Sequence, residues 1–532
     1  MSTELRRIKR ALISVSNKDS VETVAKDLFR SGVEIISTGG TAEHLRSEGI
    51  STTDVSHITE FPELLDGRLK TLHPKIHGGI LADRDDKDHI KSMNHYNIPE
   101  IDLVIVDLYP FEESFKSGSA LADMIENIDI GGPTMIRAAA KNFKSVTVIV
   151  DTEDYSRLLK QMDEHDGCTD VSFRKSLAEI AFARTAEYDS KISNWFLTMS
   201  NTQFPRRIVT AGKLQKNLRY GENPHQHGSY YSSGESKNFF NAFELLQGKD
   251  LSYNNINDVT SALQILSDYG SCEEAVVAII KHGAPCGVAI RLSALEAYNA
   301  AYDCDRMSAF GGIVALNSTV DGETASAIVK IFTEVIIAPN ITAEARTVFS
   351  HKKAVRVLTY GEGGLETFTQ KKYNQREVFG GFLLQETDTK KTLSKDLKIV
   401  SKRRPSETET KDMLFAWKLV KHVRSNAIVL AKDQKTLAIG GGQVSRLDSA
   451  RIAKNKLSEA LKSIGSDIDE VNGIVASSDA FFPFPDGVEN LAEAGVTAII
   501  QPGGSLNDSD VIEIANKLDI AMAFTGIRHF SH

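Results

Sequence analysis

The sequence lacks the features that mark several large classes of protein. It has 4 cysteines in 532 residues, and no two of them form a C-x-x-C pair. This predicts neither a disulfide framework nor a zinc site, and reduced thiols in a reducing compartment fit best. No run of 18 apolar residues occurs, and residues 1–7 lack the apolar core of a signal peptide. We therefore expect a cytoplasmic protein without a membrane partner.

Three common ligand-binding motifs are also missing. The chain has no G-x-x-x-x-G-K-[ST], no H-E-x-x-H and no complete G-x-G-x-x-G after a strand. This argues against P-loop, zinc-protease and dinucleotide-binding proteins. The formal net charge of -9 argues against a general nucleic-acid binder, because affinity for a phosphate backbone needs a basic surface. Small anionic ligands remain compatible with the composition, since a pocket can be basic inside an acidic protein.

The length predicts two to four domains, each large enough to bury a core. The first two hundred residues alternate strand-like and helix-like segments, which is typical of a parallel α/β sheet. Ligands of such sheets bind beyond the carboxyl ends of the strands. The expected strands are 11–15, 33–36, 103–106 and 146–150, and the expected helices are 21–30 and 41–48.

Two of these strands are followed by short polar turns. The first turn runs over 14–18 and the second over 37–41, where Ser-Thr-Gly-Gly-Thr leads straight into a helix. Free backbone amides and the positive end of a helix dipole suit a phosphate. Taken alone, the second turn is equally compatible with a plain capped turn that has Thr41 as N-cap. Two such turns on one sheet edge favour an anion site.

Further cations follow in this half. Arg68 and Lys70 alternate, so they would project together from an extended loop and neutralise a phosphate; the alternative is a solvated basic loop. A Gly-Gly-Pro start predicts an alanine-rich helix that ends near Lys141. This helix is equally compatible with a buried structural role, with Lys141 as a favourable C-terminal cation.

The second half is centred on a lysine and a histidine at the end of an apolar run. Residues 275–280 predict a buried strand, and Lys281 and His282 follow it at the start of a Gly/Pro/Gly turn. Two proton-active groups on a rigid edge are well placed for chemistry. The alternative is a solvated strand end with a hydrogen-bonded turn histidine.

Other segments of this half also suggest a binding site. After a strand at 473–476, three phenylalanines and two prolines over 481–485 form a ledge suited to a flat heteroaromatic ring, or else a plug in the core. A hairpin is predicted between 421 and 448. The recurrence of strand, glycine turn and helix predicts two related subdomains, and a linker is expected at 201–207.

Several long strings resemble one protein family. They are G-R-L-K-T-L-H-P, I-D-I-G-G-P-T, R-A-A-A-K-N, L-R-Y-G-E-N-P-H-Q, S-D-A-F-F-P-F-P-D-G-V and I-I-Q-P-G-G-S. The family is the bifunctional purine biosynthesis enzymes, which join 5-aminoimidazole-4-carboxamide ribonucleotide formyltransferase to inosine monophosphate cyclohydrolase. The resemblance runs from about residue 11 to the C-terminus.

The resemblance implies an α/β protein with two parts. Residues 1–200 would form a methylglyoxal-synthase-like parallel α/β domain that closes the formylated nucleotide to inosine monophosphate with loss of water. Residues 201–532 would form a larger α/β region of two related subdomains. That region would transfer the formyl group from 10-formyltetrahydrofolate, and no metal is implied. A homodimer with transferase sites shared between subunits is also implied.

The resemblance assigns the formyl transfer to Lys281 and His282. The arylamine nucleophile is weak because its lone pair is delocalised, so a base must remove a proton during attack, and an imidazole suits that task. Lys281 would stabilise the oxyanion or the leaving folate nitrogen. The nucleotide would be held by Arg219, Tyr220, Gly311, Glu334, Asn426, Arg446 and Arg528. The folate would be held by Leu447, Phe481, Asp486 and Ser505.

For ring closure, the resemblance assigns the proton transfers to Lys141, Asp129 and Tyr109. The phosphate and ribose would be held by Ser16, Lys18, Thr38, Gly39, Gly40, Thr41, Arg68, Lys70 and Thr71. Asp107 departs from the family, which usually has asparagine before Leu-Tyr-Pro-Phe, so an acceptor replaces a donor at a nucleotide contact. Arg306-Met307 stand where a proline is common before Ser308, so the local turn is expected to differ.

Two other interpretations compete with this one. In the first, the N-terminal half is a regulatory nucleotide-binding module without catalysis; Lys141, Asp129 and Tyr109 favour an enzyme, although all three could serve binding. In the second, Pro285-Cys286-Gly287 belongs to a zinc deaminase. That interpretation fails because the sequence lacks the H-x-E and the second cysteine that such a site needs, and Cys286 fits a small buried residue better.

Overall fold

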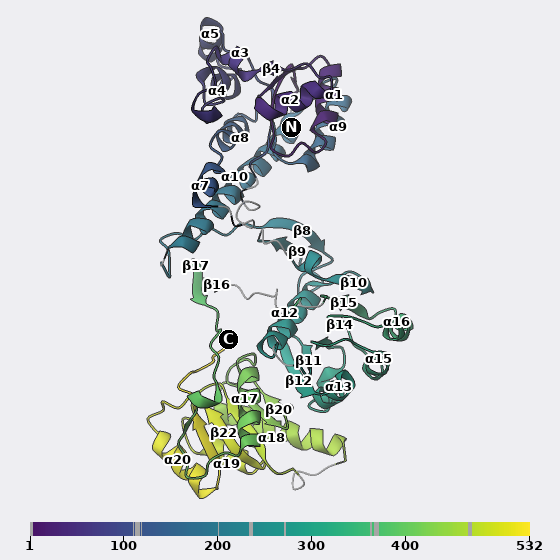
Figure 1. The fold of residues 1–532 in the computed structure, drawn as a ribbon, viewed down its shortest axis with the longest axis vertical. Helices are drawn as coiled ribbons and strands as arrows, with labels where there is room; N and C mark the ends of the chain where they lie inside the picture. Colours follow the sequence, from purple (N-terminus) through teal and green to yellow (C-terminus); the bar gives the residue numbers. More distant parts are fainter. Residues whose placement is uncertain are drawn as a thin grey trace. The chain divides into compact units, whose positions relative to one another are not determined.

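The computed structural model describes residues 4–532 except 110, 112–117, 119, 201, 234–237, 271–272, 362–363, 366–371 and 466–470. The chain forms two compact units, Met1–Lys213 and Leu214–His532 (Figure 1). The division falls later than the boundary expected after residue 200, because residues that follow the last helix of the first unit still bind it. Asn194 donates to the Val209 carbonyl and Lys213 pairs with Glu153. Of the helices in the described ranges, none is both long and apolar enough to cross a bilayer.

The first unit is built on a five-stranded parallel sheet, as expected. Its strand order is β4-β3-β2-β5-β6. β2, β3 and β5 are short apolar runs, and because all five strands are parallel, the turns that follow them meet at one edge. The bounds are β2 Arg10–Ser14, β3 Glu34–Ser37, β4 Thr53–Asp54, β5 Leu103–Val106 and β6 Thr147–Ile149. A separate antiparallel pair joins β1 Arg6–Arg7 to β7 Cys168–Thr169.

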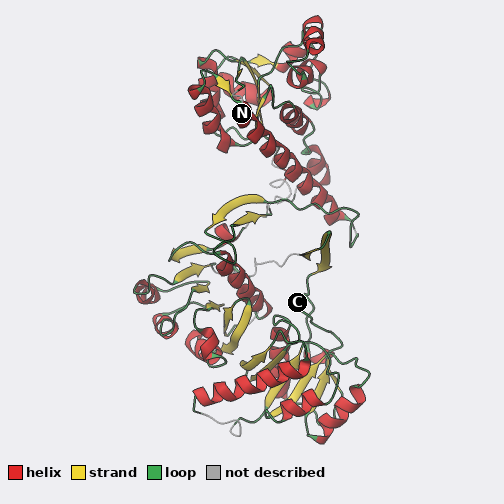
Figure 2. Ribbon diagram, turned by 180° about the vertical axis from the view of Figure 1, so that it is seen from behind, coloured by secondary structure: helices red, strands yellow, loops and turns green. Residues whose placement is uncertain are grey.

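The helices of the first unit bury their apolar faces against this sheet and form one hydrophobic core with it. Helix α10 is the long helix of this unit (Figures 1 and 2). The bounds are α1 Val21–Arg30, α2 Gly39–Ser47, α3 Val55–Thr59, α4 Pro74–Leu81, α5 Lys87–His95, α7 Leu121–Glu126, α8 Gly131–Lys141, α9 Tyr155–Glu164 and α10 Val171–Met199, with 3-10 turns at Leu65–Gly67 and Thr152–Asp154.

The second unit is built on a mixed sheet of 12 strands. Their order is β10-β15-β14-β13-β11-β12-β20-β19-β21-β22-β23-β18. The bounds are β10 Glu244–Gln247, β11 Ala275–Lys281, β12 Ala284–Arg291, β13 Ile313–Leu316, β14 Val335–Ala338, β15 Arg356–Thr359, β18 Lys398–Ile399, β19 Ile428–Lys432, β20 Lys435–Gly440, β21 Ile474–Ser478, β22 Val496–Gln501 and β23 Ala521–Phe524. Two separate hairpins are β8 Lys213–Leu218 with β9 Gly228–Ser232, and β16 Tyr373–Val378 with β17 Gly381–Glu386.

The two halves of this sheet repeat one topology, which confirms the expected pair of related subdomains. In the first half β11 and β12 form a hairpin, β13 is antiparallel to β11, β14 and β15 follow in parallel, and β10 closes the edge antiparallel. In the second half β19, β20, β21, β22, β23 and β18 take the same places with the same directions. The halves meet where β12 pairs with β20.

The helices of the second unit follow the same repeat and flank the strands (Figure 2). Helix α12 precedes β11 as α17 precedes β19, and α13 follows β12 as α18 follows β20. The bounds are α11 Phe239–Ala242, α12 Tyr253–Asp268, α13 Ala294–Tyr302, α14 Arg306–Ala309, α15 Gly322–Ile328, α16 Ala343–Ser350, α17 Glu407–Val420, α18 Arg446–Ser463, α19 Asp486–Ala492 and α20 Asp508–Lys517, with a 3-10 turn at Ser394–Asp396.

A buried arginine joins the segments at the N-terminal edge of the first sheet. The Arg174 side chain on α10 is fully buried, and its guanidinium donates to the carbonyls of Phe143 at 2.8 Å and Lys144 at 2.9 Å. It also donates to the carbonyls of Glu4 and Thr169. Burial lowers the pKa of Arg174 to about 10, so the group stays charged at neutral pH. Four carbonyls, from four different residues of the chain, therefore depend on one buried side chain.

We predict that Arg174→Met destabilises the first unit by about 3 kcal/mol, because it removes a fully buried side chain that binds four carbonyls. Urea unfolding is followed by fluorescence in a Trp417→Phe background, where Trp195 is the one remaining tryptophan. The control is Arg30→Met, because the Arg30 side chain is 76% exposed. A loss for Arg174→Met no larger than the loss for Arg30→Met contradicts the prediction.

Candidate active sites

In the first unit the turns after β2 and β3 lie side by side and bind each other. Ser14 and Thr38 share a hydrogen bond between their hydroxyls at 2.9 Å. The Thr41 hydroxyl donates to the Val15 carbonyl and accepts from the Val15 amide. Helix α2 begins two residues earlier than expected, so its N-cap is Thr38, and Thr41 is a buried residue of its first turn. Thr41 therefore joins the two predicted turns.

Two lysines stand at this edge. Lys18 Nζ donates to Thr41 Oγ1 at 3.0 Å. Burial lowers the pKa of Lys18, the Lys70 charge adds to that effect and the Asp107 charge opposes it. Lys70 Nζ lies beside Gly39, 3.5 Å from where a Cβ on that glycine would stand. An anion bound between the two ammonium groups would relieve their repulsion.

The loop that contains Arg68 and Lys70 does not have the expected extended conformation, so that part of the prediction is wrong. The segment is not extended: it forms a 3-10 turn at Leu65–Gly67 followed by further turn, and Gly67 has φ +84°. A turn directs neighbouring side chains differently from a strand. Arg68 pairs with Glu126, and its side chain is 66% exposed.

Three proton-active side chains gather at the carboxyl end of β5. Asp107 accepts hydrogen bonds from the amides of Ser16 and Asn17, the second at 2.8 Å. Burial raises the pKa of Asp107, and also that of Asp129, which the charge of Asp107 raises further. Burial and then the charges of Asp129 and Asp107 raise the pKa of Tyr109. These shifts show that the three groups sense one another.

Asp129 is held in place at the start of α8. Its carboxylate accepts from the Gly132 amide at 2.8 Å, and its own amide donates to the Tyr188 hydroxyl at 2.8 Å. A side chain at position 131 would collide with the Thr71 hydroxyl, so this helix start lies against the 68–71 turn. The Asp129 carboxylate therefore stands near the residues predicted to hold phosphate and ribose.

Lys141 is not brought together with Asp129 and Tyr109 within one chain. It is the last residue of α8, about 15 Å along the helix axis from Gly131. The neighbouring residue, Asn142, donates to the carbonyls of Ile80 and Ala82 at the end of α4. These contacts are therefore made at the end of α8 and not at its start. The exposed Lys141 side chain stands at the opposite end of α8 from the site.

In the second unit the strand registers bring the predicted transferase residues to one edge of the sheet. β11 ends there at Lys281, and the pairing of Ile280 with Ile313 places Gly311 at the same edge. β14 starts there after Glu334, because it is parallel to β13. In the other half, the pairing of Ile428 with Gly440 and Ser478 gathers Asn426, Arg446, Phe481, Ser505 and Arg528 in the loops at that edge.

Lys281 and His282 lie at a tight hairpin between β11 and β12. The turn consists of His282 and Gly283, with φ +54° and +71°. It is shorter than the expected Gly/Pro/Gly turn, because Ala284-Pro285-Cys286-Gly287 belong to β12. Lys281 Nζ donates to the Phe310 carbonyl at 2.7 Å. His282 is exposed at the tip of the turn.

Two predicted nucleotide contacts lie beside this turn. Gly311 has φ +77°, which favours glycine, and its amide donates to the Phe332 carbonyl at 2.7 Å. Glu334 accepts a hydrogen bond from Arg356 at 2.8 Å, so its carboxylate is already paired. The Arg356 side chain is 10% exposed and fixes the orientation of that carboxylate.

Asn426 and Arg446 belong to a buried polar network. Arg446 donates to Asn426 Oδ1 at 2.7 Å and to Ser478 Oγ at 2.7 Å, and it pairs with Asp479. The Arg446 and Asp479 side chains are 5% and 0% exposed. Because its charge is already neutralised, Arg446 presents less net charge to an anion than its sequence position suggested.

The predicted aromatic ledge is divided between core and surface. Phe482 is fully buried in the core of the second half, whereas the neighbouring Phe481 is partly exposed and Phe484 is 59% exposed. Asn507 donates to the Pro483 carbonyl at 2.7 Å, which joins the ledge to the loop that contains Ser505. Part of the ledge is therefore packed in the core, and part of it is exposed. Leu447 is partly buried and Asp486 is exposed.

A large cavity of about 1370 Å³ reaches the β11–β12 turn through Gly283. Arg528 lines it, and its guanidinium lies 4.3 Å from the centre of the Phe530 ring. Arg219 and Tyr220 bind each other through a 2.9 Å hydrogen bond, but they do not line this cavity. The sequence analysis missed Arg424, Lys421 and His422, which line it; the string Lys-His-Val-Arg was the available signal.

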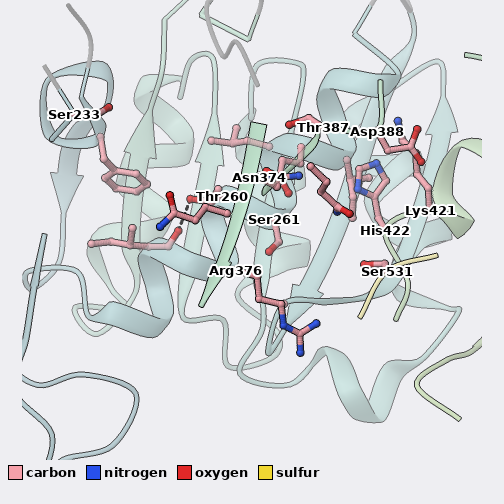
Figure 3. A pocket seen from close by; sticks show the side chains of 18 of the residues that line it. Ser233, Thr260, Ser261, Asn374, Arg376, Thr387, Asp388, Lys421, His422 and Ser531 are labelled. Atoms are coloured by element: carbon pink, nitrogen blue, oxygen red, sulfur yellow. Dashed lines mark hydrogen bonds between the residues drawn. The ribbon is translucent and has the colours of Figure 1, made fainter. Parts of the chain in front are cut away.

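The wall that contains Lys421 and His422 is ionic. Both side chains bind the Asp268 carboxylate, Lys421 at 2.8 Å. They lie near Asp388 in Figure 3, and Asp388 pairs with the buried imidazole of His529.

The described cysteines give no reason to expect thiol chemistry. Burial raises the pKa of Cys286 and Cys304 to about 12, so both thiols stay protonated at neutral pH. Cys168 is partly exposed and free, and Cys272 lies outside the described residues. The described residues contain no cluster of three His, Cys, Asp or Glu side chains arranged to hold a metal ion.

Comparisons with known proteins cover the whole chain. The family model "AICARFT/IMPCHase bienzyme" matches residues 139–456, and the model "MGS-like domain" matches residues 20–134. The chain is 52% identical to the "Bifunctional purine biosynthesis protein PurH" of Paracoccus denitrificans, over 99% of each chain. It is 50% identical to the protein of that name from a Ruegeria species, over 100% of each.

One solved structure, titled "Crystal structure of ForH", is 34% identical and matches with a TM-score of 0.32. The match covers 36% of this chain and 99% of that chain. The full-length relatives and the bienzyme model agree with each other and with the α/β folds of both units. The chain therefore belongs to the AICARFT/IMPCHase bienzyme family, whose members are bifunctional formyltransferase and cyclohydrolase enzymes of purine biosynthesis.

Proposed function

We propose that the second unit transfers the formyl group and that the first unit closes the ring. The formyl donor would be 10-formyltetrahydrofolate and the acceptor 5-aminoimidazole-4-carboxamide ribonucleotide. The observation that carries the proposal is the strand register of the second unit, which gathers the hairpin turn, the ledge and Arg528 at one edge of the sheet.

In formyl transfer, the exocyclic amine of the nucleotide attacks the formyl carbon, and the folate nitrogen leaves. His282 would accept the amine proton, because its imidazole is exposed at the tip of the turn. Lys281 Nζ would move from the Phe310 carbonyl to the developing oxyanion or the leaving nitrogen. Arg219, Tyr220, Gly311, Glu334, Asn426, Arg446 and Arg528 would hold the nucleotide, and Leu447, Phe481, Asp486 and Ser505 the folate.

The distance between the two groups of residues supports a shared site. From β11 to β21 the sheet order contains four strand spacings, which is about 19 Å. Lys281 and His282 stand at one end of this span, and Phe481 with the folate-binding loops at the other. A homodimer in which each transferase site takes residues from both copies would bring the two groups closer together.

In ring closure, the carboxamide nitrogen attacks the formyl carbon, and water is lost. Asp129 would accept the proton from nitrogen, because its carboxylate is held at the start of α8 by the Gly132 amide. Tyr109 would donate to the departing hydroxyl, because its raised pKa keeps the phenol protonated. Lys18 and Lys70 would bind the phosphate together with Ser16, Thr38, Gly39, Gly40, Thr41, Arg68 and Thr71.

Asp107 would shape this site rather than donate to the nucleotide. Its carboxylate accepts from the amides of Ser16 and Asn17 and so fixes the loop that leads to Lys18. A regulatory module without catalysis would need the anion-binding turns but no base. The coupled pair of Asp129 and Tyr109 therefore favours the enzyme.

We predict that His282→Ala lowers the rate of formyl transfer by a factor of about 10² to 10⁴, because a general base is lost. The variant should still cyclise added formylated nucleotide at the normal rate. Both products are followed with aminoimidazole nucleotide and formylfolate as substrates. His351→Ala, at an exposed histidine of the same unit, is the control. Normal formylation by His282→Ala would show that His282 is not the base.

Asp129→Asn should slow ring closure by at least about 10²-fold, because the amide cannot take the proton. In the wild type, kcat/KM for ring closure should fall with decreasing pH at a value above 3.8, because the pKa of Asp129 is raised above that value. A base works when deprotonated, so activity is present above its pKa and lost below it. Asp123→Asn on the exposed face of α7 is the control, and ring closure equal to this control excludes Asp129.

Lys141 remains a proposed participant, and its place at the far end of α8 requires that a second copy supply it. We predict that Lys141→Ala slows ring closure without weakening nucleotide binding. Mixing Lys141→Ala chains with Asp129→Asn chains should restore about a quarter of the wild-type rate, since half of the dimers are mixed and each has one intact site. If the mixture stays inactive while each variant binds nucleotide, both residues must serve a site within one chain.

A further inference from the structure

One carboxylate binds both central residues of the β11–β12 turn, which contains the proposed catalytic histidine of the second unit. Asp258 on α12 accepts a hydrogen bond from the His282 amide at 3.1 Å and another from the Gly283 amide at 2.7 Å. These are the two central residues of the β11–β12 hairpin. Asp258 is half-buried and lies under the turn. Burial raises its pKa, while the two amides and the charge of His282 act in the opposite direction.

The backbone at His282 needs such support. With φ +54° it lies in the left-handed region, which costs a residue with a side chain about 1 kcal/mol or more. Two-residue hairpins of this type prefer Asn-Gly or Gly-Gly, because both central residues have positive φ. Histidine at the first central position is unfavourable by itself. The two bonds to Asp258 offset that cost and fix the direction of the turn.

The second repeat contains the same arrangement without the histidine. The β19–β20 hairpin turns at Asp433 and Gln434, with φ +50° and +52°. Asp412 on α17 accepts from the Asp433 amide at 2.8 Å and from the Gln434 amide at 2.7 Å. The lysine before the turn also recurs, as Lys432. Holding the turn is therefore a property of the repeat, and it does not depend on the chemistry of the turn residues.

The two aspartates occupy equivalent places in their helices. Asp258 and Asp412 each occupy the sixth position of their helix. Each helix begins with a serine in a capping box, Ser252 with Asn255 and Ser406 with Glu409. Burial also raises the pKa of Asp412. The chain thus provides its own control: the same device in two places, with a proposed catalytic histidine in only one.

We propose that Asp258 is a positioning residue for formyl transfer, which holds the His282 imidazole at the place where it meets the amine of the nucleotide. This inference rests on the proposed role of His282 as the base. The carboxylate acts through the backbone of the turn, because it binds the amides of His282 and Gly283. A displacement of about 1 Å at such a position can lower a rate 10²-fold.

The test compares Asp258→Asn with Asp412→Asn. Each replaces one of two carboxylate acceptors by an amide, so both should lower stability to a similar extent. Asp258→Asn should lower kcat for formyl transfer by about 10- to 100-fold, with KM for the nucleotide changed less than about twofold. Asp412→Asn should change kcat for transfer less than about twofold. Ring closure should be unchanged in both variants, which shows that the chains are folded.

Two further variants make the test specific. Asp258→Glu keeps the charge and both acceptors, so it should retain more transfer than Asp258→Asn, and it also serves if the asparagine variant does not fold. In a His282→Ala background, Asp258→Asn should have no further effect on kcat, because a residue that acts through the histidine has nothing left to position.

The inference is overturned if Asp258→Asn lowers kcat no more than Asp412→Asn does, or if its effect in the His282→Ala background is as large as in the wild type. These results leave the proposed function standing as long as His282→Ala alone abolishes transfer. Normal transfer by His282→Ala removes the proposed base and the positioning role together. The His282→Ala variant therefore distinguishes a failure of the positioning role from a failure of the proposed function.

Discussion

The pairing of β11 with its two neighbours is the constraint on which the second unit depends. β11 is buried on both faces: Val276, Ala278 and Ile280 pack in one core, and Val277 and Ile279 pack in another. Because side chains alternate between the faces of a strand, a shift of one residue would exchange these two rows and turn Lys281 to the other face. Pairing with β12 on one side and β13 on the other fixes the register, and it thereby fixes the positions of Lys281 and His282. The repeat in the second half shows that this scaffold exists independently of the chemistry, since the equivalent turn contains Asp433 and Gln434.

The first unit also gathers charged groups at one edge of its sheet. Two ammonium groups and two carboxylates share a half-buried site, and burial raises the pKa of Asp107 and Asp129 while it lowers that of Lys18. Each shift moves a group toward its neutral form, because burial disfavours a charge. Asp107 accepts hydrogen bonds from the amides of Ser16 and Asn17 and so fixes the loop that leads to Lys18. In the proposed function, a loop that is already formed would reduce the ordering that nucleotide binding requires.

The sequence was sufficient for the positions of the strands and for the turns that follow them. The apolar runs at 103–106 and 275–280 became β5 and β11 with bounds equal or nearly equal to those expected, because burial dominates there. The sequence was not sufficient where a turn or a contacting residue determines the position of a side chain. The segment with Arg68 and Lys70 is a turn rather than an extended loop, with Gly67 at positive φ, and Thr41 lies inside α2 because the helix begins at Gly39. Phe482 enters the core while Phe484 stays outside, since neighbouring positions in a bent loop face opposite environments. The place of Lys141 at the far end of α8 follows from helix rise, which the motif alone does not convey.

Arg446 shows why residue type alone is an insufficient guide to an anion site. An arginine in a motif suggests a receptor for phosphate, but here it is buried against Asp479 and bound to Asn426 and Ser478. The pair is close to neutral, and separating it would leave the fully buried Asp479 carboxylate without its partner, which is strongly unfavourable. Arg446 can therefore orient Asn426 and shape the loop, whereas it offers little net charge to an anion. Arg424 and Arg528, by contrast, are exposed and line the large cavity that reaches the β11–β12 turn. The fold thus separates an arginine whose charge is already paired inside the protein from arginines whose side chains are exposed.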